Sequence, residues 1–445
     1  MRPVISGHLG RRDFIRVGAL HFLGISLGEF LAFEAARGAS PGKAQACILL
    51  WLDGGASHID MWDPKPASLF RPISTNVPGL RISELFPKLA RHMDKISAIR
   101  SIYSLENDHV AGHHYAMTGH KPNPAMKFPS LGSIISKELG VRNQIPPYVM
   151  MPSLTGPYDE VFKAQILGGA WDPMILAGGE EAPEGEVRVE IKDLKVPDLS
   201  LPNELAAARL DDRRGFLEIV DRAYRERAEV AEFADMDAYS EQAYRMILAP
   251  QVRRAFDLSQ ENEKTKEAYG RNGFGQSVLL ARRLVEAGSR FVTACGYKTA
   301  SWDTHNQHNT KLRDRLAPPL DQAVSALLVD LKDRGLLDST VVAVMSEFGR
   351  TPSINSNGGR DHWPHCWSML LGGGGIAGGA VVGASDERGA AVAGRQVSIG
   401  DIHATLYKAM GIDWNKEIMH PIGRPLFIAN GLNDQPGVPI RELVG

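Results

Sequence analysis

The chain has 445 residues, enough for one large domain or two to three average ones, and 43% of them are hydrophobic, as in an ordinary folded protein. Its 50 lysines and arginines nearly balance its 52 aspartates and glutamates, so the net charge is −2. These values exclude an intrinsically disordered chain, and without a basic run they argue against nucleic acid as the main partner.

The N-terminus has the features of an export signal. Arg11 and Arg12 precede a mildly apolar stretch over 17–33, and small residues follow it up to Gly38. This order predicts export by the twin-arginine machinery, cleavage of a signal over residues 1–38, and a periplasmic or extracellular location. The apolar stretch contains a histidine, a glutamate and three glycines, so we expect no stable membrane span. An ordinary amphipathic first helix is the alternative interpretation.

Three short apolar runs end in glycine or polar residues. The run 46–52 ends in Asp53-Gly54-Gly55, the run 289–295 ends in Gly296, and the run 340–345 ends in Ser346-Glu347. A continuous apolar run closed in this way predicts a buried parallel strand. Weaker strand patterns cover 96–102, 148–151 and 380–382, and helical patterns cover 131–139, 275–287, 319–334 and 399–410.

This alternation predicts an α/β fold with a mainly parallel central sheet, in which reactive groups gather at the carboxyl ends of the strands. We expect one domain over 39–445. Residues 200–270 are highly charged and helical in period, which predicts a helical insertion, and 170–200 are expected to form a long surface loop. The run Gly372–Gly375 lacks the Lys-Ser/Thr of a phosphate-binding loop, so we expect a turn between strands.

Nine of the fourteen histidines fall into four short segments that also hold glycine and carboxylates, and we expect these segments to be loops. They are DGGASHID over 53–60, NDHVAGHHYAMTGH over 107–120, WDTHNQH over 302–308 and GRDHWPH over 359–365. Imidazole beside carboxylate is the ligand chemistry of zinc and manganese sites and also serves general acid–base catalysis. The clustering therefore predicts a reaction centre.

A site for two metal ions needs ligands from several strand-end loops, because one short peptide cannot surround two ions. The residues that we predict as ligands of a divalent metal (zinc, manganese or calcium) are Asp53, Asp303, His305, His308, Glu347, Asp361, His362 and His365. Arg350 and Arg360 are candidates to bind an anionic substrate through bidentate contacts.

Several motifs together resemble a bacterial family known as domain of unknown function 1501 (DUF1501), often called sulfatase-like, within the alkaline phosphatase superfamily. They are the twin arginines, LLWLDGGASHIDMWDPKP, TGH, WDTHNQH, SEFGRTP, GRDHWP and GGGGIAGGAVVG. The resemblance spans roughly residues 45–430 and implies an alkaline phosphatase-like three-layer sandwich with bound divalent metal. It also implies hydrolysis of phosphate or sulfate esters.

The superfamily's metal ligands map onto particular residues of this chain. The early strand-end aspartate maps onto Asp53, and the later strand-end acid maps onto Glu347. The resemblance maps the late aspartate with its histidine onto Asp303 and His305 or His308, and the last histidine onto His362 or His365.

The chain departs from the sulfatase pattern at the nucleophile. Sulfatases place it about nine residues before a Thr-Gly pair, here Thr118-Gly119, and counting back reaches His109; the arginine that follows falls on His113. The superfamily's histidine or asparagine after the strand-end acid is replaced by Phe348.

Three explanations stay open. The nucleophile is supplied by Ser57, Ser104 or Thr118; or hydroxide held by a metal attacks directly; or the protein is neither a phosphatase nor a sulfatase. In the second case the general acid or base is His109, His113 or His114, although a hydrogen-bonded pair in a loop is the alternative for the last two.

The function that we expect is an exported metal-dependent hydrolase acting on small-molecule or polysaccharide esters of phosphate or sulfate. The alternative is a non-catalytic exported module that keeps the fold for binding or assembly. Turnover of aryl phosphate or aryl sulfate esters would distinguish the two.

Overall fold

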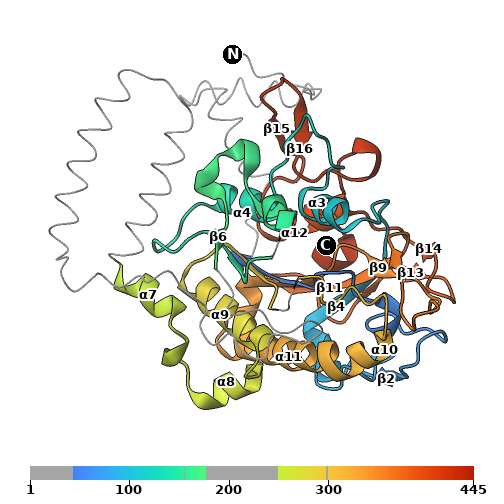
Figure 1. Ribbon diagram of the computed structural model, residues 1–445. Coiled ribbons are helices and arrows are strands. Elements are labelled where there is room, and N and C mark those ends of the chain that lie inside the picture. Colours follow the sequence, from blue (N-terminus) through green and yellow to red (C-terminus); the bar gives the residue numbers. More distant parts are fainter. Residues whose placement is uncertain (1–43, 155, 177–248, 297–298) are drawn as a thin grey trace, which may run out of the picture. The chain divides into compact units, whose positions relative to one another are not determined.

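Figure 1 shows a computed structural model of the chain, which describes residues 44–154, 156–176, 249–296 and 299–445. The predicted export signal, residues 200–248 of the predicted insertion and 177–200 of the predicted surface loop lie outside this set. Within it, none of the helices combines the length and the apolar character that crossing a membrane requires.

A mixed sheet in the order β12-β4-β11-β8-β1-β7-β5-β6 forms the centre of the described fold. Its strands are β1 (Ala46–Trp51), β4 (Ile96–Ile102), β5 (Tyr148–Met151), β6 (Met174–Ile175), β7 (Phe291–Ala294), β8 (Thr340–Met345), β11 (Trp367–Gly373) and β12 (Val381–Val382). Neighbouring strands run parallel except where β11 pairs with β4 and β8. The predicted α/β fold with a mainly parallel sheet is thus confirmed.

The two central strands are covered on both faces. β1 and β8 pair in parallel with Trp51 opposite Met345, and every residue of both strands is buried. Ile48 and Leu50 pack into one hydrophobic cluster, while Leu49 and Trp51 pack into another on the opposite face. This double burial explains why the sequence shows unbroken apolar runs instead of an alternating pattern.

Helices form a layer on each face of the sheet (Figure 1). On the face of Ile48 lie α7 (Pro250–Phe256), α8 (Glu263–Tyr269), α9 (Gly273–Ala287) and α11 (Ala317–Asp333), the last preceded by α10 (His308–Lys311). On the face of Trp51 lie α3 (His109–Thr118), α4 (Leu131–Leu139), α12 (Ile399–Ala409) and α13 (Arg441–Val444). The result is a three-layer sandwich, as the resemblance implied.

Among the described residues, four two-stranded sheets lie outside the central one. They are β2 (Pro72–Ser74) with β3 (Arg81–Ser83), β9 (Gly349–Arg350) with β10 (His362–Trp363), β13 (Ala384–Ser385) with β14 (Val392–Gly394), and β15 (Glu417–Met419) with β16 (Pro425–Phe427). The second of these positions functional residues, because it pairs His362 with Arg350, three residues after Glu347.

The prediction that residues 107–120 form a loop is wrong, because the segment contains helix α3. The Asp108 side chain accepts hydrogen bonds from the backbone amides of Val110 and Ala111 and so caps the first turn. Gly119 ends the helix in the left-handed conformation, with φ of 73°.

The expected turn at Gly372–Gly375 is only partly right, because Gly372 and Gly373 are the last residues of β11. A Cβ on Gly372 would lie 2.4 Å from the carbonyl oxygen of Lys95 on the neighbouring chain segment. Glycine is therefore needed inside this strand for close approach of the backbones, and the sequence pattern hides the strand.

Stability at acid pH should depend on His403, a buried histidine of α12 whose Nε2 donates to the carbonyl oxygen of Ala116 at 3.0 Å. Burial lowers the pKa of His403 to about 4, so the folded chain keeps this ring neutral, whereas the unfolded chain protonates it below about pH 6.5. The contribution of the neutral, buried His403 ring to the free energy of unfolding is fully present above about pH 6.5 and is lost as the pH falls towards 4. Between pH 7 and 4.5 we expect the wild type to lose about 2–3 kcal/mol more free energy of unfolding than His403→Gln, measured by urea unfolding. Parallel pH profiles would contradict this.

Candidate metal centre

Two acids reach the same edge of the sheet because β1 and β8 are parallel neighbours. Asp53 follows β1, Glu347 follows β8, and the amide of Gly54 donates to Glu347 Oε1 at 2.9 Å. Gly54 has φ of 113°, and a Cβ there would lie 2.4 Å from the backbone nitrogen of Asp303. Only glycine lets the loop after β1 approach the Asp303 segment so closely.

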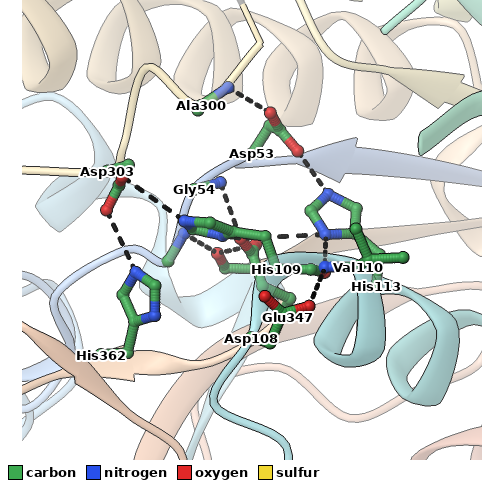
Figure 2. A network of polar contacts seen from close by, with 12 residues as sticks. Asp53, Gly54, Asp108, His109, Val110, His113, Ala300, Asp303, Glu347 and His362 are labelled. Atoms are coloured by element: carbon green, nitrogen blue, oxygen red, sulfur yellow. Dashed lines mark hydrogen bonds and ion pairs between the residues drawn. The ribbon is translucent and has the colours of Figure 1, made fainter. Parts of the chain in front are cut away.

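Helix α3 brings two imidazoles to this edge. His109, Gly112 and His113 lie three and four positions apart and therefore share one face of the helix. A Cβ on Gly112 would come within 3.1–3.2 Å of Phe348 and Glu347, so the glycine allows the helix to pack against the loop after β8. Figure 2 shows His109 and His113 meeting the acids at the strand ends.

The first set of side chains, which we call the inner group, consists of Asp53, His113 and Glu347, all buried. His113 Nδ1 lies 2.6 Å from the carbonyl oxygen of His109, which can only accept, so Nδ1 carries a proton. His113 Nε2 contacts Asp53 Oδ1 directly. Trp51 Nε1 donates towards both atoms, at 3.2 Å from His113 Nε2 and 3.3 Å from Asp53 Oδ1. Because a neutral ring would also turn its lone pair towards the carboxylate, a second proton or a bound cation would stabilise this contact further.

The second set, which we call the outer group, consists of His109, Asp303 and His362, with His305 beside it. His362 Nδ1 donates to the carbonyl oxygen of Asn107 at 2.6 Å, and His305 Nδ1 lies 2.7 Å from Asp361 Oδ1. Both Nε2 atoms therefore turn inward, 3.0 Å from each other and 3.3 and 3.1 Å from Asp303 Oδ1.

His109 joins the two groups. Its Nδ1 lies 2.8 Å from Glu347 Oε1, and its Nε2 lies 3.4 Å from Asp303 Oδ2, buried and without a hydrogen bond among the described residues. The Nε2 atom thus faces the same space as the Nε2 atoms of His362 and His305. Three imidazole nitrogens converge there on the carboxylate of Asp303, whose Oδ1 also accepts from Arg350, and a cation would satisfy the electron pairs of the imidazoles.

The pKa values of these groups show that the site stabilises positive charge on its imidazoles and negative charge on its carboxylates. Burial alone would lower the pKa of His109, but its contacts with Asp303 and Glu347 raise it to about 10. The pKa of His113 is raised, because the charges of Glu347 and Asp53 outweigh its burial. Burial opposes ionisation of Glu347 and Asp303, yet the neighbouring imidazoles, with Arg350 beside Asp303, hold both carboxyl pKa values below their usual range.

These residues fit divalent metal ions. In each group, one ligand atom per residue can be chosen so that the three lie within 4.8 Å of one another. A mixture of carboxylate and imidazole suits zinc or manganese, whereas calcium prefers oxygen ligands alone. Metal binding would displace the protons that the imidazoles otherwise hold, which makes affinity dependent on pH.

The structure separates the predicted metal ligands into three sets. Asp53, Asp303, Glu347 and His362 lie in the two groups. His305 lies at the edge of the outer group with its side chain 41% exposed, and the exposed Asp361 holds it there. His308 and His365 lie elsewhere: His308 contacts Asp60 and Thr304 in the interior, and His365 is exposed beside Tyr103 and Trp363.

The predicted catalytic histidines also divide. His109 and His113 belong to the ligand groups, but His114 lies elsewhere on α3, where its Nδ1 lies 2.9 Å from the carbonyl oxygen of His120 and its ring meets Phe128.

The three hydroxyl groups considered as nucleophiles are all buried: Ser57 donates to Asp60, Thr118 donates to the carbonyl oxygen of His114, and Ser104 lies at 1% exposure. None is presented to a substrate.

The placement of the two arginines does not fit the predicted contact with substrate, because both are completely buried. Arg350 donates to the carbonyl oxygens of Gly54, Gly55 and Arg360 and pairs with Asp303 Oδ1 at 2.5 Å. Arg360 pairs with Asp60 and donates to three backbone carbonyl oxygens. Their guanidinium groups brace the loops of the site.

Two aromatic residues of the site were missed from the sequence. Phe348 packs on the rings of His362 and His109, with centroids 4.5 and 5.2 Å away, and so supports the imidazoles from the position directly after Glu347. Tyr158, in the short helix η4 (Gly156–Phe162), packs on His113 at 4.8 Å. Nothing in the sequence around Tyr158 marks it as part of a site.

The comparisons with known proteins identify a family and no activity. The chain matches the model of DUF1501, described as a protein of unknown function, over residues 44–443, and it matches no curated protein.

Solved structures similar to it include Ps i-CgsB, with 11% identity and a TM-score of 0.39 over 84% of this chain and 72% of that one. The PsFucS1 sulfatase from Pseudoalteromonas sp. has 13% identity and a TM-score of 0.35 over 86% and 70%. The alkaline phosphatase from the Antarctic bacterium TAB5 has 13% identity and a TM-score of 0.39 over 83% and 99%.

Proposed function

The chain belongs to the DUF1501 family, as its motifs predicted, and from its site we propose that it is a metal-dependent hydrolase of phosphate or sulfate esters. The observation that carries the proposal is the convergence of the Nε2 atoms of His109, His305 and His362 on Asp303, beside the buried pair of Asp53 and His113. A centre built only for stability would pair each acceptor with a donor.

In this proposal the inner and outer groups each hold one divalent ion, zinc or manganese. Bound ions polarise ester oxygens and lower the pKa of water. The chain's own residues fix the geometry: Arg350 orients Asp303, the carbonyl oxygen of His109 orients His113, and Phe348 supports His109 and His362.

We propose direct attack by water, because the described serines and threonine considered as nucleophiles are buried. The water oxygen bonds to phosphorus or sulfur, the bond to the ester oxygen breaks, and the alcohol leaves with a proton. His305 is the imidazole of the site most open to solvent, and Asp361 orients it, so it is placed to move that proton.

The substrate in this proposal is a small-molecule or polysaccharide ester, and the protein acts after export. The support for export is the order of features at the N-terminus, where Arg11 and Arg12 precede an apolar stretch and small residues. Substituting lysine for both arginines and following the protein in cell fractions tests the export route.

Removal of metal tests the reaction itself. Treatment with a chelator should reduce hydrolysis of 4-nitrophenyl phosphate or 4-nitrophenyl sulfate by at least about a thousandfold, because metal ions supply several kcal/mol of transition-state stabilisation. Zinc or manganese should restore the activity, and calcium should not.

A protein that binds no divalent metal would overturn the proposal. A protein that binds metal but turns over neither ester would favour the alternative, a non-catalytic module, which the burial of the candidate hydroxyl nucleophiles independently supports.

A further inference from the structure

A second cluster of motif residues lies beside the metal centre without joining it. It centres on Asp60, the last residue of the short helix η1 (His58–Asp60), and includes His308 and Arg360. All three side chains are at most 1% exposed. None of them belongs to the inner or outer group, so the proposed reaction leaves them unexplained.

Asp60 is surrounded by donors. Its Oδ2 lies 2.9 Å from His308 Nε2, 2.8 Å from Arg360 Nε and 2.6 Å from Ser57 Oγ, while its Oδ1 accepts from Ser68 Oγ at 2.5 Å. Burial opposes ionisation of Asp60, but these contacts hold its carboxyl pKa well below the usual range. The carboxylate therefore remains charged and completely paired in the interior.

Each partner comes from a different ligand-bearing segment. Asp60 follows the ligand Asp53 by seven residues, His308 follows the ligand Asp303 by five, and Arg360 precedes the ligand His362 by two.

Backbone hydrogen bonds also connect the segment around His308 to the segment around Arg360. The amide of Arg360 donates to the carbonyl oxygen of Thr304, and the amide of His308 donates to that of Gly358, each at 3.0 Å. Asp60 thus connects the segment that carries Asp53, in the inner group, to the two segments that carry Asp303 and His362, in the outer group.

We propose that Asp60 is a positioning residue that fixes the spacing of the loops carrying Asp53, Asp303 and His362 and thereby sets the metal affinity of the site. This inference rests on the proposed function, because it assumes that those residues hold metal. Side chains behind a metal site that orient its ligands typically change the affinity 10- to 100-fold when they are lost.

The test compares Asp60→Asn with a control variant, Glu261→Gln, that should lose a similar amount of free energy of unfolding; both are made in the full-length protein. Glu261 is also a buried carboxylate, 8% exposed, and it pairs with Arg282 at 2.7 Å and with Arg283, both on α9, away from the ligand groups. Urea unfolding should show that both variants are destabilised. Only Asp60→Asn should bind Co²⁺ more weakly, by about 10- to 100-fold, with an altered visible spectrum of the bound ion.

Hydrogen exchange supplies a readout that does not need metal. In the metal-free protein, the amides of His308 and Arg360 should exchange faster in Asp60→Asn than in the wild type, and at the wild-type rate in Glu261→Gln. Should Asp60→Asn fail to fold, Ser68→Ala removes one hydrogen bond to Asp60 and keeps every charge, and should show smaller changes in the same direction.

The outcomes separate the two proposals. If the wild type binds no Co²⁺, the proposed function fails, and the exchange rates still judge the role of Asp60. If the wild type binds Co²⁺ and Asp60→Asn binds it with the same affinity and spectrum, the positioning role is overturned. Unchanged exchange at His308 and Arg360 would overturn it as well.

Discussion

Replacing Glu347 by glutamine is expected to abolish binding at the inner group and to reduce ester hydrolysis by at least about a thousandfold, since the loss of a bound ion costs several kcal/mol of transition-state stabilisation. Glutamine keeps the shape of this fully buried side chain and its contact with the amide of Gly54. It removes the negative charge that faces His109 and His113. Elemental analysis of the purified variant and kcat/KM on 4-nitrophenyl esters measure the two effects.

Glu261→Gln is the matched control, because it neutralises another buried carboxylate among the helices on the opposite face of the sheet. That variant should keep the metal content and the activity of the wild type. Full metal content together with full turnover in Glu347→Gln would remove the inner group from the mechanism.

Replacing His109 by alanine should reduce the bound metal from two ions per chain to one and lower kcat/KM by about a thousandfold. The reason is its position, with one ring nitrogen beside Glu347 and the other facing Asp303. If His109 instead acted only as a general acid or base, the variant would keep both ions, while kcat would fall and its pH profile would change.

Metal content therefore distinguishes these two roles more directly than activity does. His92→Ala serves as the control for loss of a histidine, since His92 lies outside both groups and should leave metal content and turnover unchanged. Two ions bound to His109→Ala would contradict the assignment of His109 as a ligand.

The sequence predicted the part of the site that depends on the sheet. Unbroken apolar runs identified β1 and β8, and because parallel neighbours end at one edge, Asp53 and Glu347 could be placed together. Strand β11 was missed because its two glycines resemble a turn, although Gly372 serves close backbone packing against Ile96 and Gly373 against Thr340.

The helix that supplies His109 and His113 was missed for a different reason. Its packing face carries His109, Gly112 and His113 in place of apolar residues, so it shows no apolar stripe, and only Asp108 and Gly119 mark its ends. The sequence also left His305 and His308 as alternatives for the ligand that follows Asp303, because both stand in the same short segment. The burial of Asp60 decides which of them turns away from the site, and that is a property of the tertiary structure.

Helix α3 gives one imidazole to each ligand group, and the two are separated by little more than one helical turn. A rotation of α3, or a shift along its axis, would therefore displace the ligands of both groups at once. The close contact between Gly112 and Phe348, where a Cβ would lie 3.1 Å from the ring, opposes such a movement. The loops over 302–308 and 359–365 serve the outer group alone. Under the proposed function, adaptation to a different ester is therefore open to the two loops, whereas α3 must keep its register.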